Sequence, residues 1–172
     1  MSPRAAWRLE SLGFERVYDY EAGKQNWLAS GLPTEGSLAD VPRAGDVARD
    51  DVPTCGLEER LGEVAERVRA AGWDTCVVVN DERVVLGLLR AAHLARDPDL
   101  PVADAMSAGP STFRPHVYAM EMARYMTEHD LPSAPVTTGE GVLVGLLVRE
   151  DAVRVAEEAH RALHEREHGY PE

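Results

Sequence analysis

Three histidines near the C-terminus have the spacing of a metal site. His160, His164 and His168 are four residues apart, which in a helix places neighbouring imidazoles on one face, where a pair can bind a transition-metal ion. A solvated helix end rich in histidine explains the same spacing, and a pH-dependent contact across a dimer is a third hypothesis. We adopt the solvated helix and predict no metal site.

The two cysteines, Cys55 and Cys76, are the other residues with intrinsic reactivity. They are too few for a disulfide framework, which favours a reduced, cytoplasmic protein. A reactive thiolate needs electropositive surroundings, but Glu58 and Glu59 follow Cys55. We therefore predict that the chain has no catalytic residue and is not an enzyme.

The charge balance excludes further classes of protein. The 172 residues contain 18 Lys and Arg against 30 Asp and Glu, a net charge of −12, so the chain repels nucleic acids and anionic membranes. The longest apolar runs, residues 84–89 and 142–148, are far shorter than the roughly 20 residues that cross a bilayer. We predict a globular protein that binds neither nucleic acid nor membrane.

The elements that must position any site form an internal repeat. When the chain is shifted by 58 residues against itself, nine identities fall within the 49 positions from Asp46 to Leu94 without a gap. Each copy carries an apolar helical stripe, namely Leu61, Val64, Ala65 and Val68 in the first and Ala119, Met122, Ala123 and Met126 in the second. Gly72 fits the end of the first helix, and Pro115 fits the first turn of the second.

The order predicted for each copy is helix, hairpin, helix. The hairpin strands are residues 75–79 and 84–89 in the first copy and 133–137 and 142–148 in the second, and second helices start near Ala91 and Asp151. Each copy has a short extended entry before its first helix, 52–54 in the first and 110–112 in the second. A single copy would be marginally stable because its sheet has one exposed face. The fold class is therefore α/β (α+β), with two pseudo-symmetric copies packed sheet to sheet and a cleft between them.

This pattern resembles the cystathionine-β-synthase (CBS) domain, which occurs as tandem pairs called Bateman modules. The resemblance rests on residues 102–106 (VADAM), 131–136 (LPSAPV) and 145–151 (GLLVRED), the last being similar to the family's Gly-hydrophobic-hydrophobic-Thr/Ser-x-x-Asp signature. It implies a non-catalytic regulatory module that binds AMP, ADP, ATP or S-adenosylmethionine between the copies and that dimerises.

The resemblance also implies roles for particular residues. The signature Asp, here Asp151, would bind the ribose hydroxyls, since a carboxylate accepts two hydrogen bonds from a cis-diol. Val148 replaces the Thr/Ser of the signature, and Arg90 and His93 replace the Thr/Ser and Asp of the first copy. At most one adenosine site per chain is therefore expected. The expected ligand contacts are Asp151, Arg149, Arg90, His93, Thr112, Leu131, Pro135 and Val136.

Each of these residues also has a structural alternative. Asp151 fits the N-cap of a helix over residues 152–166, and the two arginines could be solvated surface charges. Leu131, Pro135 and Val136, the expected apolar slot for adenine, could pack in the core. Because a polyphosphate must bind against an acidic background, we favour AMP or S-adenosylmethionine over ATP.

The first 45 residues have a different character. Residues 9–20 and 23–33 resemble the C-terminal end of a rhodanese domain, but no Cys precedes them to act as its nucleophile. We predict an arm whose aromatic side chains cover the CBS pair or a partner chain: Trp7, Phe14, Tyr18, Tyr20 and Trp27.

The predicted organisation is an arm and linker (1–45), two repeats (46–103 and 104–161) and a helical tail (162–172). The leading hypothesis is a homodimeric sensor of an adenosine ligand that acts on an unknown effector protein. A structural or interaction dimer with vestigial clefts is the alternative, and a sulfurtransferase remnant is the least favoured. The sequence names neither the ligand nor the regulated partner.

Overall fold

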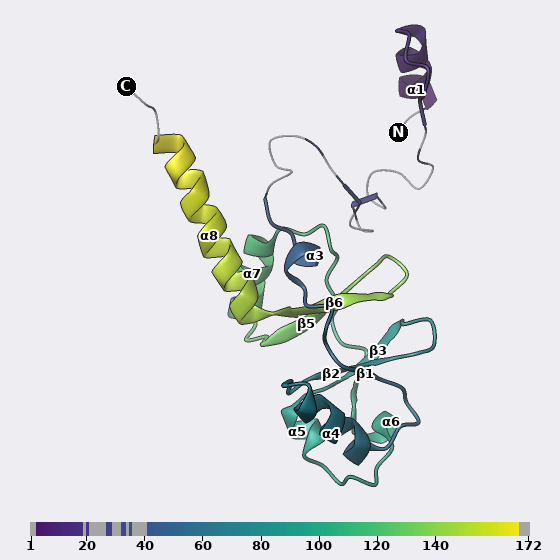
Figure 1. Cartoon of the computed structure of the whole chain (residues 1–172), viewed down its shortest axis with the longest axis vertical. Coiled ribbons are helices and arrows are strands. Elements are labelled where there is room, and N and C mark those ends of the chain that lie inside the picture. Colours follow the sequence, from purple (N-terminus) through teal and green to yellow (C-terminus); the bar gives the residue numbers. More distant parts are fainter. Residues whose placement is uncertain are drawn as a thin grey trace.

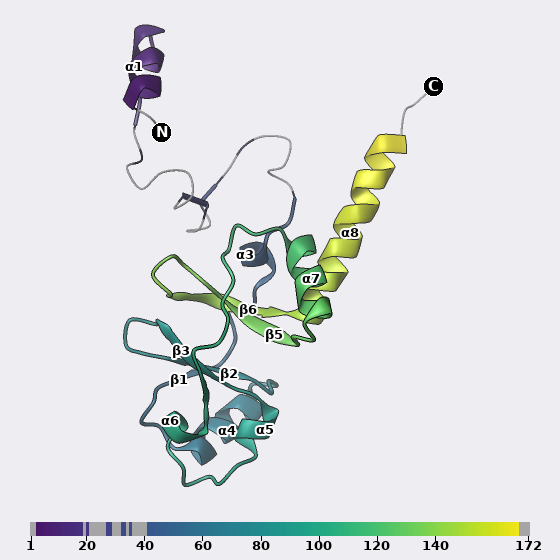
Figure 2. The ribbon, with the colours of Figure 1, turned by 180° about the vertical axis from the view of Figure 1, so that it is seen from behind.

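Two α/β units stack with their sheets facing each other (Figures 1 and 2). The computed structural model describes residues 3–18, 20, 27–28, 32–33, 35 and 41–168, and among these the side chains of residues 4–162. From one end of the paired units to the other, the layers are helix, sheet, sheet and helix. The predicted α/β pair is confirmed.

The first unit contains a four-stranded sheet in the order β1-β2-β3-β4. Its strands are β1 (Thr54–Cys55), β2 (Cys76–Val79), β3 (Val85–Leu89) and β4 (Ser107–Ala108), and its helices are α4 (Leu61–Ala70), α5 (Ala91–Leu94) and α6 (Val102–Ala105). The apolar stripe of α4 is fully buried, as predicted. Gly72 ends the helix with φ +74°, a conformation that costs glycine little because it has no Cβ.

The second unit repeats this plan with fewer paired strands. Helix α7 (Ala119–Glu128) precedes the antiparallel pair β5 (Ser133–Thr137) and β6 (Leu143–Val148), and α8 (Arg149–His168) follows. The stripe of α7 is buried as predicted. Pro115 lies four residues before α7 begins, so the prediction that it occupies the first turn is wrong.

The units exchange their leading segments, which the repeat analysis did not predict. Helix α3 (Ala44–Val47) lies at the start of the first repeat, but Ala44 is buried in the core of the second unit. In return α6 and β4 lie at the start of the second repeat, and Val102 and Ala105 belong to the core of the first unit. The register is the same in both exchanges, since Leu88 pairs with Ser107 and Leu146 pairs with Arg49. Leu146 follows Leu88 by 58 residues, and Ser107 follows Arg49 by the same number.

A third apolar cluster joins the two sheets. It consists of Val52, Val77, Leu88, Leu143 and Leu146, all nearly inaccessible to solvent. The sheets therefore pack face to face as predicted. Gly145 is required here, because a Cβ at this position would lie 2.8 Å from the backbone oxygen of Arg49, closer than non-bonded atoms allow.

Helix α1 and the described aromatic residues Phe14 and Tyr18 that follow it do not cover the paired units of their own chain. Helix α1 (Pro3–Ser11) lies apart from both sheets (Figures 1 and 2), and the exposed fractions of Trp7, Phe14 and Tyr18 are 68%, 59% and 79%. Tyr20 and Trp27 instead contact each other edge to face at 5.2 Å. Of the two predicted alternatives, packing on the chain's own CBS pair is wrong for Trp7, Phe14 and Tyr18, and packing on a partner chain stays a prediction.

Candidate ligand-binding site

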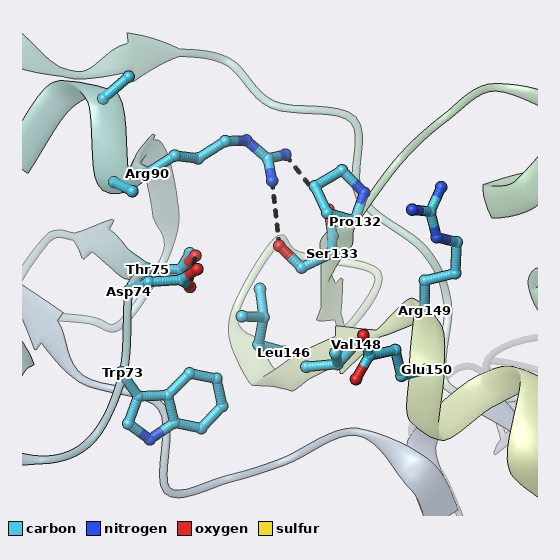
Figure 3. Close-up of a pocket in the computed structure, with 12 residues that line it drawn as sticks. Trp73, Asp74, Thr75, Arg90, Pro132, Ser133, Leu146, Val148, Arg149 and Glu150 are labelled. Carbon is cyan, nitrogen blue, oxygen red and sulfur yellow. Dashed lines mark hydrogen bonds between the residues drawn. The ribbon is translucent and has the colours of Figure 1, made fainter.

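A cavity of about 430 Å³ lies between the two repeats. The strand starts and helix starts that line it come in pairs 58 residues apart: Asp74 and Pro132, Thr75 and Ser133, Arg90 and Val148, Ala91 and Arg149, Ala92 and Glu150. Trp73 and Leu146 complete the wall (Figure 3). This axial cavity therefore straddles the pseudo-two-fold axis that relates the repeats.

Arg90 spans this cavity from the first repeat to the second. It precedes α5 at the end of β3, and its guanidinium donates hydrogen bonds to Oγ of Ser133 at 3.1 Å and to the carbonyl oxygen of Ser133 at 3.2 Å (Figure 3). Ser133 is 6% exposed. The contact is a latch between repeats, and a bound anion would compete with Ser133 for the same N–H groups.

Arg149 supplies the second guanidinium from the opposite repeat. It is the first residue of α8, its backbone N–H donates to the carbonyl of Pro132 at 2.9 Å, and its side chain pairs with Asp130 at 2.8 Å. The carboxylates of Asp74 and Glu150 also line the cavity. Two arginines and two acidic residues thus line the cavity, which suits a ligand of low net charge better than a polyphosphate.

Asp151 lies outside the axial cavity. It lines a neighbouring hollow of about 530 Å³ with Arg49, Asp46 and Arg154 among its walls, and its carboxylate pairs with Arg154 at 3.0 Å. Because α8 begins at Arg149, Asp151 lies inside the first turn. The alternative prediction that it is the N-cap is wrong.

A stacked pair lies between the two hollows. The guanidinium carbon of Arg49 lies 4.2 Å from the ring centre of Trp73, and its N–H groups donate to both carboxylate oxygens of Asp51 at 3.1 and 2.8 Å. This hydrogen bonding lowers the pKa of Asp51 and raises that of Arg49. Trp73 lines the cavity and Arg49 lines the hollow with Asp151. Sequence reasoning missed both, although an aromatic residue between a helix-ending glycine and a strand was a usable signal.

The other expected ligand contacts lie elsewhere. His93 is tied into the start of α5, where its Nδ1 accepts a hydrogen bond from the backbone N–H of Arg90 at 3.0 Å, and its Nε2 lies 3.2 Å from Oγ of Ser107. Leu131, Pro135 and Val136 pack around β5, with Val136 fully buried. Thr112 is half-buried just before the bridge from Phe113 to Val136. None of these five residues lines the axial cavity.

The cysteines and histidines do not form a metal site among the described side chains. Cys55 and Cys76 are free and buried, and a hydrogen bond with Cys55, together with burial, raises the pKa of the Cys76 thiol. No group of three or more potential metal ligands occurs in the described part of the chain. His160 is exposed, and the side chains of His164 and His168 lie outside the described residues. None of the described helices is long and apolar enough to span a membrane.

The fold is a tandem pair of α/β repeats that exchange their leading segments and enclose a cavity on the axis between them. The family model described as "CBS domain" matches residues 44–98 and 102–158, so the chain belongs to the CBS-domain family. The resemblance to the CBS domain predicted from the sequence is thereby confirmed, and the resemblance of the N-terminal segment to a rhodanese domain stays a prediction.

Several known proteins are similar to this chain. An uncharacterized protein of Methanopyrus kandleri is 27% identical over 119 residues, covering 64% of this chain and 61% of its own length. The cytosolic domain of the Mg²⁺ channel MgtE in complex with ATP is 26% identical, with a TM-score of 0.61, and the match covers 69% of this chain and 51% of that one. The structure of CBSX2 in complex with AMP has 20% sequence identity and a TM-score of 0.62, and the match covers 70% of this chain and 99% of that one. CBSX2 is a protein of Arabidopsis thaliana. This chain thus spans about half to three-fifths of the first two.

Proposed function

We propose that this chain is a non-catalytic regulatory module that binds an adenosine-type ligand in the cleft between its repeats. The observation that carries the proposal is the axial cavity, into which the two repeats bring Arg90 and Arg149 from opposite sides. Guanidinium groups bind phosphate through paired hydrogen bonds. Related CBS pairs have been captured with ATP and with AMP, which supports the same ligand class here.

Among adenosine ligands, the charges favour a monophosphate. Asp74 and Glu150 balance the two arginines of the cavity, and the whole chain carries a net charge of −12. A triphosphate would bring up to four negative charges into surroundings that are neutral locally and negative overall. We therefore propose the order AMP over ATP, with S-adenosylmethionine as the cationic candidate that Asp74 and Glu150 would accept.

Calorimetry and thermal shift with AMP, ATP and S-adenosylmethionine test this proposal. Saturating AMP should raise the melting temperature, because a ligand at 100 times its Kd stabilises the native state by about 2.7 kcal/mol. Arg149→Gln should weaken AMP binding about tenfold or more, the equivalent of one lost charge-assisted bond. Arg60→Gln is the matched control, since the exposed pair of Arg60 with Asp99 lies outside the cavity. Equal AMP affinity in both variants would contradict the assignment of Arg149.

A second function is favoured by a specific observation. Each cavity arginine already has a protein partner, Ser133 for Arg90 and Asp130 for Arg149, so the cleft is internally satisfied. A structural or protein-interaction module with vestigial clefts would look like this. Absence of binding by all three ligands at millimolar concentration would favour this alternative.

We also propose that the chain forms a homodimer through α7 and α8. A groove of about 510 Å³ runs between these helices along Met120, Ala123, Val153 and Ala156. Met120 is 50% exposed in the single chain, a large apolar side chain that association would bury. Light scattering should give twice the chain mass, and Met120→Glu should reduce it to one chain. A wild-type mass of one chain would overturn the proposal.

A further inference from the structure

The contact between Trp73 and Arg49 joins the walls of the two hollows. Trp73 borders the axial cavity with its two arginines, whereas Arg49 borders the hollow that contains Asp151. Arg149, Glu150 and Asp151 are consecutive, so the two hollows adjoin at the start of α8. In a nucleotide the ribose joins the phosphate to the base, so a ligand with its phosphate at the arginines and its base on Trp73 would place its ribose where the two hollows adjoin.

The contact on Trp73 has the geometry of a base-stacking position already occupied. A guanidinium group is planar and lies 4.2 Å from the centre of the indole ring. Nucleic-acid bases stack on the faces of aromatic side chains, so the guanidinium covers a ring face that a base could use. The remainder of Trp73 packs against the core of the first unit and against the cluster between the sheets, so the ring is held in place and the Arg49 side chain is the mobile partner.

Arg49 can leave without exposing an uncompensated buried charge. The side chains of Arg49 and Asp51 are 47% and 58% exposed, so both ions remain solvated when the stack opens. Only the side chain needs to move, because the backbone of Arg49 is fixed by two hydrogen bonds of 2.9 Å with Leu146. An exposed cation–π contact is worth about 0.5–1 kcal/mol, whereas base stacking is worth about 1–3 kcal/mol.

We propose that Trp73 is the platform for the base of the bound nucleotide and that a purine takes the place of the Arg49 guanidinium on its ring. This inference rests on the proposed function and names the residue that would recognise the base. Arg49 is then a competitor that occupies the platform in the absence of ligand. Because stacking accepts any planar base, Trp73 contributes affinity, and discrimination between ligands comes from the groups around it.

Tryptophan fluorescence tests the proposal directly, since the chain contains three tryptophans and two of them, Trp7 and Trp27, belong to the arm. The variant Trp7→Phe/Trp27→Phe leaves Trp73 as the sole reporter. Saturating AMP should quench its emission, because a stacked purine quenches indole. Ribose 5-phosphate, which lacks the base, should bind at least about fivefold more weakly than AMP and should leave the emission unquenched.

Two substitutions should change the AMP affinity in opposite directions. Arg49→Gln removes the competitor and should tighten binding about two- to fivefold, the equivalent of the exposed contact. Trp73→Leu should weaken AMP binding at least about fivefold and leave the affinity for ribose 5-phosphate unchanged. Trp73→Phe keeps an aromatic platform and should restore most of the affinity, which guards against misfolding of the leucine variant. Arg60→Gln is the control, an arginine whose exposed pair with Asp99 lies outside both hollows.

The outcomes separate the two proposals. AMP binding by calorimetry without quenching of Trp73, or weaker AMP binding by Arg49→Gln, would overturn the platform and leave the proposed function intact. No binding of AMP, ATP or S-adenosylmethionine to the wild-type chain would overturn both. Quenching by AMP together with tighter binding by Arg49→Gln supports the platform.

Discussion

The latch between Arg90 and Ser133 should contribute measurably to stability even without ligand. Replacing Arg90 by Ala removes two hydrogen bonds from a charged donor, at 3.1 and 3.2 Å. One such bond contributes about 1.5–3 kcal/mol when short and buried. Because Arg90 is half-buried and both distances are long, we expect ~2 kcal/mol for the two together. The melting temperature of a chain of this size should then fall by about 4–8 °C.

Urea unfolding of four proteins measures the latch: the wild type, Arg90→Ala, Ser133→Ala and the double variant. The double-mutant cycle should give a coupling energy of roughly 0.5–1.5 kcal/mol, since contacting residues are not additive. Arg60→Ala is the matched control, because its pair with Asp99 has exposed fractions of 63% and 86% and such pairs contribute little. Additivity within about 0.3 kcal/mol, or an equal loss in the Arg60 variant, would refute the latch.

Three further predictions address packing, pH and reactivity. Gly145→Ala should destabilise the fold by about 1–3 kcal/mol, because its Cβ would lie 2.8 Å from a backbone oxygen, whereas Gly139→Ala has open space and should change little; equal melting temperatures would contradict this. Burial and two nearby arginines lower the pKa of His116, so its contribution to stability is present above its ordinary pKa near 6.5 and is lost as the pH falls below it. His116→Asn should flatten the fall in melting temperature between pH 7 and pH 5, and an unchanged slope would exclude His116 as its source. The hydrogen bond with Cys55 and burial raise the pKa of Cys76, so a thiol reagent should label neither cysteine at pH 8 before urea unfolds the chain; rapid labelling of the native protein would contradict the buried geometry.

The elements of the repeats could be predicted because their burial patterns are local. The stripes of α4 and α7 recur every three or four residues, and the sequence placed all eight of their apolar positions correctly. Strand β5 was predicted at its observed bounds, and β2, β3 and β6 within one residue. Helix α8 was predicted to begin later than it does, and Pro115 was assigned to a helix that starts at Ala119. Helix starts are less sharply encoded, because the first turn lacks a complete set of backbone hydrogen bonds.

The candidate site was predicted in part. Arg90 and Arg149 were singled out, and both line the axial cavity. Asp151 lines the hollow beside it, and Val136 lies in the core. Trp73 and Arg49 were overlooked because neither belongs to the matched motifs, and their stacking depends on two segments that come together only in the folded chain.

The sequence by itself determined the fold family, the 58-residue repeat and the sheet-to-sheet pairing, because hydrophobic periodicity records which face of each element is buried. Only the tertiary structure decided that α3 and α6 exchange between the units, that Arg90 is bonded across the cleft, and that Trp73 and Arg49 divide the cleft from the hollow of Asp151. These relations join residues 24 to 43 positions apart or whole elements of different repeats. Such contacts depend on how whole elements pack against one another in a close-packed interior. A local pattern of residues does not contain that information.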